Sequence, residues 1–212
     1  MRVVSSFKSF DRKASRFKPQ PKVLVLCEDS KSGKRYLEEA AFYFRAKAQV
    51  EIVHCGVTHP SGIVERAVVR QKSFDKVFCV LDRDTHMCFK RALNVAKSYP
   101  KIQVIASYPC FEFWLLLHFG YSRKPFSTAG KNSPADLVTK SLRAKPSMAD
   151  YQKGKDVSYF AQLLGKPFQQ ARALAPKVLE DVALSGEHNP STEIHLLMDE
   201  FEALSKPQPI DT

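Results

Sequence analysis

Acidic side chains stand at the ends of strand-like apolar segments in this chain. The segment "VFCVLDRDTH" at residues 77–86 contains two aspartates separated by one arginine, and two further acids follow "KVLVLC". A fifth acid lies in the apolar run "FEFWLLLHF". The five acids are Glu28, Asp29, Asp82, Asp84 and Glu112. Parallel α/β sheets bind ligands outside the carboxyl ends of their strands, so these acids are candidates for one shared site.

Asp82 and Asp84 have a spacing that suits one hard cation. While the chain stays extended, residues i and i+2 face the same side, and their positions lie about 7 Å apart. Clustered carboxylates repel one another unless a divalent ion neutralises them, and oxygen-only ligands suit Mg2+ or Mn2+ rather than zinc. Mg2+ takes its remaining ligands from water and substrate phosphates. The pattern predicts phosphodiester chemistry, with Glu28, Asp82 and Asp84 as metal ligands and Glu28 alternatively as general acid or base.

Each acid also has a structural interpretation, which the sequence leaves open. Asp84 could cap a following helix. Glu28 and Asp29 could interact favourably with the dipole of a helix that begins just after them. Glu112 stands in an apolar run, where a carboxylate must be paired, hydrogen-bonded or catalytic. We therefore expect either a fourth catalytic residue or a structural hydrogen-bond acceptor at this last position.

Other phosphate and hydrolase motifs do not fit. Haloacid-dehalogenase phosphatases carry D-x-D-x-T on their first strand, whereas Thr85 directly follows Asp84 on the third. The "SKSGKRY" segment lacks the first glycine and the Ser/Thr of a P-loop, and no G-x-S-x-G is present. Among the histidines, His86 is near enough in sequence to reach the acids, while His118 is predicted to be a packed or capping residue. Trp114 is predicted to lie in the core.

The charge balance predicts an anionic partner. The chain has 212 residues, 33 Lys and Arg against 22 Asp and Glu, and a formal net charge of +11. Residues 1–21, expected to be a flexible tail, contain six of the basic residues and one acidic residue. Such a basic excess is typical of proteins that bind nucleic acid, DNA or RNA. We expect Arg12, Lys13 and Arg16 of this tail to contact it.

The composition argues against several classes of protein. No apolar segment approaches the length of about 18 residues that a membrane span needs, and the tail has no signal-peptide pattern. The five cysteines form no C-x-x-C and are expected to be reduced, mostly core residues. These features predict a cytoplasmic protein without a membrane partner.

Strand-like and helix-like segments alternate from residue 22 to residue 120. Four apolar strands, in "KVLVLC", "VEIVHCG", "DKVFCVLD" and "IQVIASYP", are each followed by a segment of helical periodicity. This order predicts an α/β fold: a small parallel sheet with helices on both faces, of the Rossmannoid kind.

Residues 121–212 are predicted to form a helical C-terminal lobe without further strands. Ser133-Pro134 reads as the N-cap and first residue of one helix. A second, "FQQARALAPKVLEDVAL", is expected to be interrupted at Pro176. A third is expected to open at Asn189-Pro190. No internal repeat is present.

The sequence resembles RloB-like proteins, which are Toprim-related proteins of bacterial defence and restriction loci. The resemblance rests on "LVLCEDSKSGKRYL", "VFCVLDRD", "SYPCFEFWLLLHF", "YQKGKD" and "NPST", which occur in order across nearly the whole chain. It implies a Toprim-like sheet and a Mg2+-dependent nuclease of antiphage defence, with Glu28, Asp82 and Asp84 holding the metal. It further implies phosphate contacts by Lys153 and Lys155. An ATPase partner from the same locus and an oligomeric assembly are further expectations.

The segment after the first strand departs from the family pattern E-G-x-x-T-E. Asp29 replaces the glycine, Ser32 the threonine and Gly33 the second glutamate. The missing acid supports a second hypothesis, a catalytically silent subunit that binds nucleic acid or a protein partner. A third interpretation is that the acids only cap helices.

Overall fold

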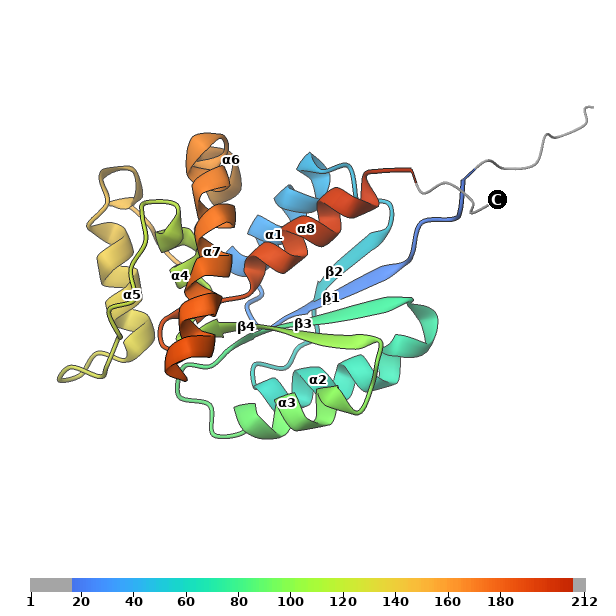
Figure 1. The fold of residues 1–212 in the computed structure, drawn as a ribbon, viewed down its shortest axis with the longest axis horizontal. Helices are drawn as coiled ribbons and strands as arrows, with labels where there is room; N and C mark the ends of the chain where they lie inside the picture. Colours follow the sequence, from blue (N-terminus) through green and yellow to red (C-terminus); the bar gives the residue numbers. More distant parts are fainter. Residues whose placement is uncertain (1–16, 208–212) are drawn as a thin grey trace, which may run out of the picture.

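The computed structural model describes residues 17–207 and shows one five-stranded sheet in the order β2-β1-β3-β4-β5 (Figure 1). The first four strands run parallel, as predicted, and β5 pairs antiparallel with β4. The strands are β1 (Val23–Cys27), β2 (Val50–His54), β3 (Lys76–Asp82), β4 (Ile102–Tyr108) and β5 (Ser191–Thr192).

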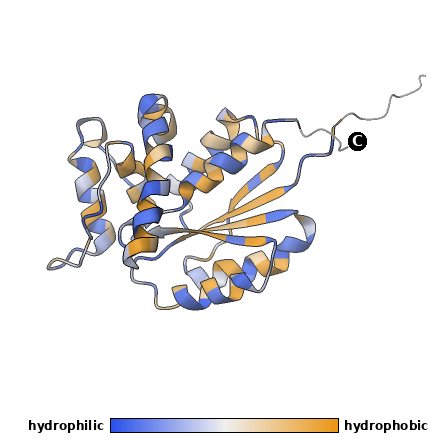
Figure 2. Ribbon diagram, in the orientation of Figure 1, coloured by the Kyte–Doolittle hydropathy of each residue, from blue (hydrophilic) through white to orange (hydrophobic). Residues whose placement is uncertain are grey.

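Helices cover both faces of the sheet. One face carries α1 (Ser32–Tyr43) and α8 (Ile194–Leu204), and the other carries α2 (Pro60–Arg70) and α3 (Phe89–Lys97) (Figure 1). Successive residues of a strand face opposite sides, so Val23 and Val25 pack with the first pair of helices and Leu24 and Leu26 with the second. Figure 2 shows the resulting hydrophobic strands between the helix layers. The central strands are buried on both faces, and this explains their continuous apolar sequences.

The remaining helices gather beyond the carboxyl ends of the parallel strands (Figure 1). They are α4 (Glu112–Leu117), α5 (Pro134–Arg143), α6 (Tyr159–Leu163) and α7 (Lys166–Ser185), with the short 3-10 turn η2 (Pro146–Met148). Another 3-10 turn, η1 (Gln71–Ser73), joins α2 to the start of β3. The predicted start of α5 is confirmed, since Ser133 and Asp136 form a reciprocal capping box. Helix α2 has His59 as its N-cap, and the side chain of this residue accepts a hydrogen bond from the Gly62 amide.

Three expectations for the C-terminal part are wrong. The chain does contain a further strand, β5, which is only two residues long and pairs with Tyr108 and Ser107 of β4. It takes the place where the last helix was expected to open, and α8 begins at Ile194 instead. The helix α7 also continues through Pro176 without interruption. Packing of this helix on its neighbours outweighs the one backbone donor that the proline lacks.

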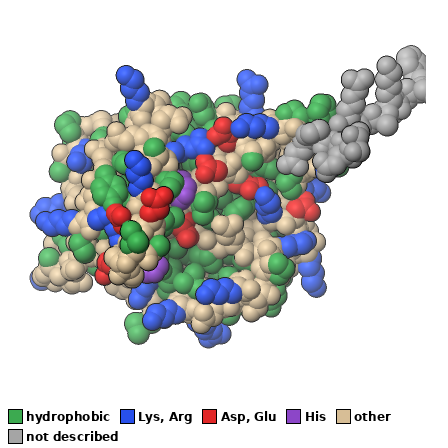
Figure 3. Space-filling model, viewed as in Figure 1, with side chains coloured by type: hydrophobic (Ala, Val, Ile, Leu, Met, Phe, Trp, Pro, Cys, Tyr) green, Lys and Arg blue, Asp and Glu red, His purple; other side chains and the backbone are tan. Residues whose placement is uncertain are grey.

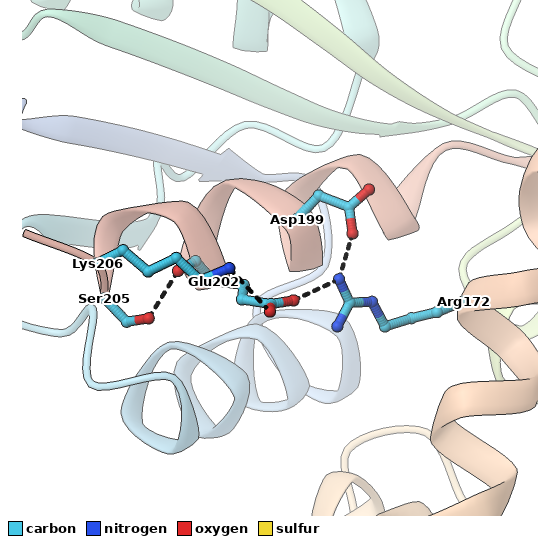
Figure 4. A network of polar contacts seen from close by, with 5 residues as sticks. All are labelled: Arg172, Asp199, Glu202, Ser205 and Lys206. Carbon is cyan, nitrogen blue, oxygen red and sulfur yellow. Dashed lines mark hydrogen bonds and ion pairs between the residues drawn. The ribbon is translucent and has the colours of Figure 1, made fainter. Parts of the chain in front are cut away.

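Ionic contacts fasten α7 to α8. Arg172 on α7 bonds to Asp199 and, at 2.7 Å, to Glu202 on α8, and Glu202 also pairs with Lys206 (Figure 4). The guanidinium carbon also lies 5.7 Å from the centroid of the Phe44 ring. The last helix is thereby held against the same sheet face as α1.

All five cysteines are free thiols, and three of them are buried. Among residues 17–207, no helix has both the length and the apolar character needed to cross a membrane.

Candidate active site

Glu28 lies directly after β1 and reaches across to the end of β3. Its Oε2 accepts a hydrogen bond of 3.0 Å from the backbone amide of Asp82, and its Oε1 lies 2.8 Å from Nε2 of His86. The backbone amide of Glu28 donates to the Val80 carbonyl, so the pairing of β1 with β3 continues to this residue. Burial raises the pKa of the Glu28 carboxyl, while the hydrogen bond from Asp82 and the neighbouring His86 oppose the rise.

Asp82 is the last residue of β3 and stands among other charged side chains. Burial raises the pKa of its carboxyl well above the usual value, and the negative charge of Glu112 raises it further. Lys153 opposes this rise, and Glu28 and Asp29 add to it. The acids that follow β1 and β4 therefore act electrostatically on the carboxylate at the end of β3, which is the arrangement that a bound cation would relieve.

Asp84 does not continue the strand, so the expectation of an extended chain from Asp82 to Asp84 is wrong. Strand β3 ends at Asp82, and Asp84 has a backbone φ of 25°, a conformation that side chains other than glycine rarely adopt. Its amide donates to the Pro109 carbonyl at 2.8 Å. Its Oδ1 is buried without a hydrogen-bond partner among the described residues. Asp84 thus forms a strained turn rather than a simple helix cap.

Glu112 opens α4 and is 2% exposed, so its carboxylate needs partners. The Tyr151 hydroxyl donates to its Oε1 at 2.8 Å, and the Lys153 ammonium lies 3.8 Å from the same atom. Partial burial lowers the pKa of Lys153, but the negative charges of Glu112 and Asp82 outweigh that effect and raise the pKa above its usual value. A permanent cation therefore stands beside the acids.

The segment that carries Tyr151 and Lys153 is held in place at several points. Arg143 donates through Nε to the Tyr151 carbonyl at 2.7 Å, and the Gly154 amide donates to Ser32 Oγ at 2.9 Å. Gly154 has a φ of 85°, and a Cβ at this position would come within 2.4 Å of the Lys31 side chain. Glycine is required here for both reasons. The segment thus delivers Lys153 to the acids from a distant part of the sequence.

Asp29 has a structural role, as one of the alternatives proposed. Its carboxylate oxygens accept hydrogen bonds from the amides of Lys31 and Gly33, each 2.8 Å long, at the start of α1. Gly33, at the family position of the second glutamate, is buried, and a Cβ there would make ordinary contacts of 3.5 Å with Phe111. Asp29 therefore provides acceptors for backbone amides at the N-terminus of α1, and only Glu28 of this pair reaches Asp82.

The two histidines considered from sequence have different positions. His86 contacts Glu28, as described above, and so belongs to the site. His118 is buried, and its Nδ1 donates a hydrogen bond of 3.0 Å to the Trp114 carbonyl. Its Nε2 lies 3.2 Å from the Tyr36 hydroxyl, and burial lowers its pKa to about 4. The prediction that His118 is packed in the core is confirmed, as is the burial of Trp114.

The predicted nucleic-acid contacts lie in different places. Lys153 and Lys155 are both exposed, and Lys153 lies 3.8 Å from the Glu112 carboxylate. Arg12, Lys13 and Arg16 lie outside the described residues. Figure 3 shows Lys and Arg side chains spread over the whole face in view rather than gathered in one patch.

Sequence analysis missed the contribution of Tyr151, because its hydrogen bond to Glu112 joins residues 39 positions apart. The only available signal was its place in the "YQKGKD" motif beside Lys153. A tyrosine hydroxyl near a buried carboxylate cannot be inferred from spacing alone.

The carboxylate oxygens at this edge have the chemistry that a hard divalent cation requires, although the side chains do not form a compact group of ligands. Within residues 17–207, no three His, Cys, Asp or Glu side chains are grouped closely enough to hold a metal ion. Glu28 and Asp82 are nevertheless adjacent, and Asp84 offers a buried carboxylate oxygen without a partner. Carboxylate oxygens are the ligands that Mg2+ and Mn2+ prefer.

The fold and the site define an α/β protein whose mostly parallel sheet carries helices on both faces and acidic side chains at the carboxyl ends of its strands. A family model described as RloB-like protein matches residues 23–201. The chain belongs to this RloB-like family, which confirms the resemblance found in its motifs. No curated protein and no solved structure matches the chain.

Proposed function

We propose that this protein is a Mg2+-dependent nuclease that hydrolyses phosphodiester bonds of DNA or RNA in antiphage defence, with Mn2+ as an alternative ion. The single observation that carries the proposal is the contact between Glu28 and the Asp82 amide. It places the acids of two adjacent strands together at the edge where parallel sheets bind ligands. The resemblance to Toprim-related defence proteins supports the choice of nucleic acid as substrate.

Three acids of this edge would hold the metal ion: Asp82, Asp84 and Glu28. The bound ion supplies charge neutralisation of the phosphate and activation of a water molecule. Asp84 contributes a carboxylate oxygen that has no other described partner. Its strained backbone is the kind of local cost that proteins retain at functional sites.

Glu28 is also suited to proton transfer. Burial raises the pKa of its carboxyl, so the carboxylate is a stronger base than an exposed glutamate. His86 contacts the oxygen that does not bond to Asp82, and it therefore fixes the orientation of the side chain and offers a route for the proton. In this proposal Glu28 accepts a proton from the attacking water and passes it toward solvent through His86.

Lys153 is suited to bind a phosphate beside the acids. Its pKa is raised, so the ammonium stays charged at neutral pH. It is half-exposed, with a side-chain accessibility of 52%, whereas its partner Glu112 is almost fully buried. A phosphate oxygen can therefore approach the ammonium from the solvent side, while Glu112, held by the Tyr151 hydroxyl, pairs with it from within.

A second candidate function is a silent subunit that binds nucleic acid or a protein partner without cleaving. The observation that favours it is the absence of the second family acid, since Gly33 offers no carboxylate and its amide is bonded to Asp29. In that case the acids and Lys153 form a structural charge cluster. Salt-sensitive binding of nucleic acid without turnover in Mg2+ or Mn2+ is the expected behaviour.

The experiment that separates these functions is a cleavage assay on the full chain. Purified protein is incubated with single- and double-stranded DNA and RNA in Mg2+, Mn2+ or EDTA, together with Asp82→Asn and the control Asp181→Asn on α7. We expect cleavage that requires a divalent ion, loss of at least about a hundredfold in Asp82→Asn, and an unchanged rate in the control. Equal rates in Asp82→Asn and wild type would remove the acids from the mechanism.

A further inference from the structure

A cavity of about 540 Å³ lies between α5 and the segment that follows α4. This volume is within the range of small-molecule sites and is large enough for a nucleotide. It is separate from the acids at the strand ends, none of which lines it. Its lining residues include Phe119, Tyr121, Lys124, Phe126, Lys140 and Lys145.

The charge of this cavity is entirely positive. Lys124, Lys140 and Lys145 line it, and no aspartate or glutamate does. Within residues 17–207, the ammonium groups of these three lysines take part in no hydrogen bond or ion pair. By contrast, the larger hollow beside α1 contains Glu38 and Glu39, and its Arg35 is ion-paired. Three unpaired cations around one cavity attract an anion with several oxygens, such as a phosphate.

The rest of the wall is apolar and partly aromatic. Phe119, Tyr121 and Phe126 contribute rings, and the Tyr121 side chain is 45% exposed. An exposed aromatic ring beside cations is the combination that holds a base and its phosphate in nucleotide and single-strand sites. An inorganic anion alone would leave this apolar surface without a partner.

The wall that carries these rings is fixed although it has no regular secondary structure. Arg123 donates to the carbonyls of Pro190 and Glu187, and the latter bond is 2.6 Å long. The side chain of Asn189 bonds to both backbone groups of Phe126, with its Nδ2 2.8 Å from the Phe126 carbonyl oxygen. The segment before β5 thus holds the cavity wall in place, and the cavity is formed before any ligand arrives.

We propose that this cavity binds a nucleotide, with the phosphate at Lys140, Lys145 and Lys124 and the base against Tyr121. The ligand is either a free mononucleotide or one nucleotide of a single strand, since both present the same base and phosphate. The inference goes beyond the proposed nuclease function and does not require it, because neither the acids nor a metal ion takes part.

Calorimetric titration of the full chain in EDTA tests the proposal, because cleavage cannot then contribute. The probes are AMP, adenosine, inorganic phosphate and a ten-nucleotide oligothymidylate. We expect AMP or the oligonucleotide to bind more tightly than adenosine and phosphate. Binding of the oligonucleotide alone identifies the ligand as part of a strand, and binding of AMP identifies a free nucleotide.

Variants locate the binding. The double variant Lys140→Ala/Lys145→Ala is expected to weaken binding at least about tenfold, whereas the control Lys90→Ala/Lys131→Ala, with the same loss of charge outside the cavity, leaves it unchanged. Tyr121→Ala is expected to weaken AMP binding but not phosphate binding. Circular dichroism confirms that each variant is folded. Absence of binding by every probe, or equal losses in both double variants, would overturn the proposal whatever the outcome of the cleavage assay.

Discussion

The carboxylate of Glu28 accepts a hydrogen bond of 3.0 Å from the backbone amide of Asp82, and this bond joins the ends of two adjacent strands. The residues are 54 positions apart in sequence. Because β1 and β3 run parallel and in contact, their carboxyl ends meet at one edge of the sheet. The contact fixes one carboxylate oxygen of Glu28, and the other oxygen lies within hydrogen-bond distance of His86.

The first prediction concerns the charge of Glu28. Glu28→Gln keeps an oxygen that can accept the Asp82 amide, but it removes a negative charge and the proton acceptor. We expect divalent-ion binding to weaken about tenfold and cleavage to fall by more than that, since the variant loses both a ligand and a base. Titration calorimetry with Mn2+ and the cleavage assay measure the two effects separately.

Glu38→Gln is the control for that variant, because Glu38 is an exposed glutamate on α1 that pairs with Lys34. Its metal binding and cleavage are expected to match those of wild type. Equal metal affinity in Glu28→Gln and Glu38→Gln would show that Glu28 is not a ligand.

The second prediction concerns the pH dependence that Asp82 imposes on stability. Burial and the neighbouring acids raise the pKa of this carboxyl in the folded state. The protonated carboxyl therefore stabilises the folded state in full at pH values below the unfolded pKa of about 3.9. This stabilisation is lost as the pH rises through the folded pKa. Asp82→Asn removes the charge, so at pH 8 and without metal we expect its free energy of unfolding to exceed that of wild type by about 1 kcal/mol.

Urea denaturation in EDTA at pH 8 and at pH 5 measures this difference. The advantage of Asp82→Asn is expected to shrink at the lower pH, because the wild-type carboxyl then binds a proton. Addition of Mg2+ is expected to stabilise wild type and not the variant. A variant less stable than wild type at pH 8 would contradict the electrostatic account.

The third prediction separates Lys153 from Lys155. Lys153→Met removes the ammonium beside Glu112 and Asp82 while keeping much of the side-chain volume. We expect Mg2+ to bind several-fold more tightly, because a cation that competes for the acids is gone, and cleavage to fall at least about tenfold, because a phosphate contact is lost.

Lys155→Met is the matched variant, two residues away and exposed. It is expected to change neither metal affinity nor cleavage by more than about twofold, because the change at an exposed position is small. Weaker Mg2+ binding in Lys153→Met would show that the ammonium does not compete with the ion.

The fourth prediction concerns the hydroxyl of Tyr151. Tyr151→Phe removes the hydrogen bond to the buried Glu112 carboxylate. A buried charged acceptor that loses its donor costs about 1–3 kcal/mol, so we expect a loss of stability of that size at neutral pH. Tyr121→Phe, whose ring is half-exposed, is the control and is expected to lose less than about 0.5 kcal/mol. Thermal and urea denaturation measure both.

Sequence by itself determined the parallel α/β layer and the acidic residues at the ends of its strands. The apolar strands and the alternating helices follow from periodicity, because a strand buried on both faces must be apolar along its whole length. The acids at the strand ends were visible for the same reason, since a charged residue interrupts such a run. The N-cap of α5 at Ser133 was equally local, as capping depends on residues three positions apart.

Only the tertiary structure decided how these residues meet. Glu28, rather than Asp29, reaches Asp82, because the carboxylate oxygens of Asp29 accept hydrogen bonds from backbone amides at the start of α1. Asp84 leaves the strand through a left-handed turn, and Lys153 comes to Glu112 from a segment far along the chain. The short β5 also escaped prediction, because two residues give no periodicity. Local patterns determine elements, whereas contacts between residues distant in sequence depend on how the whole chain packs.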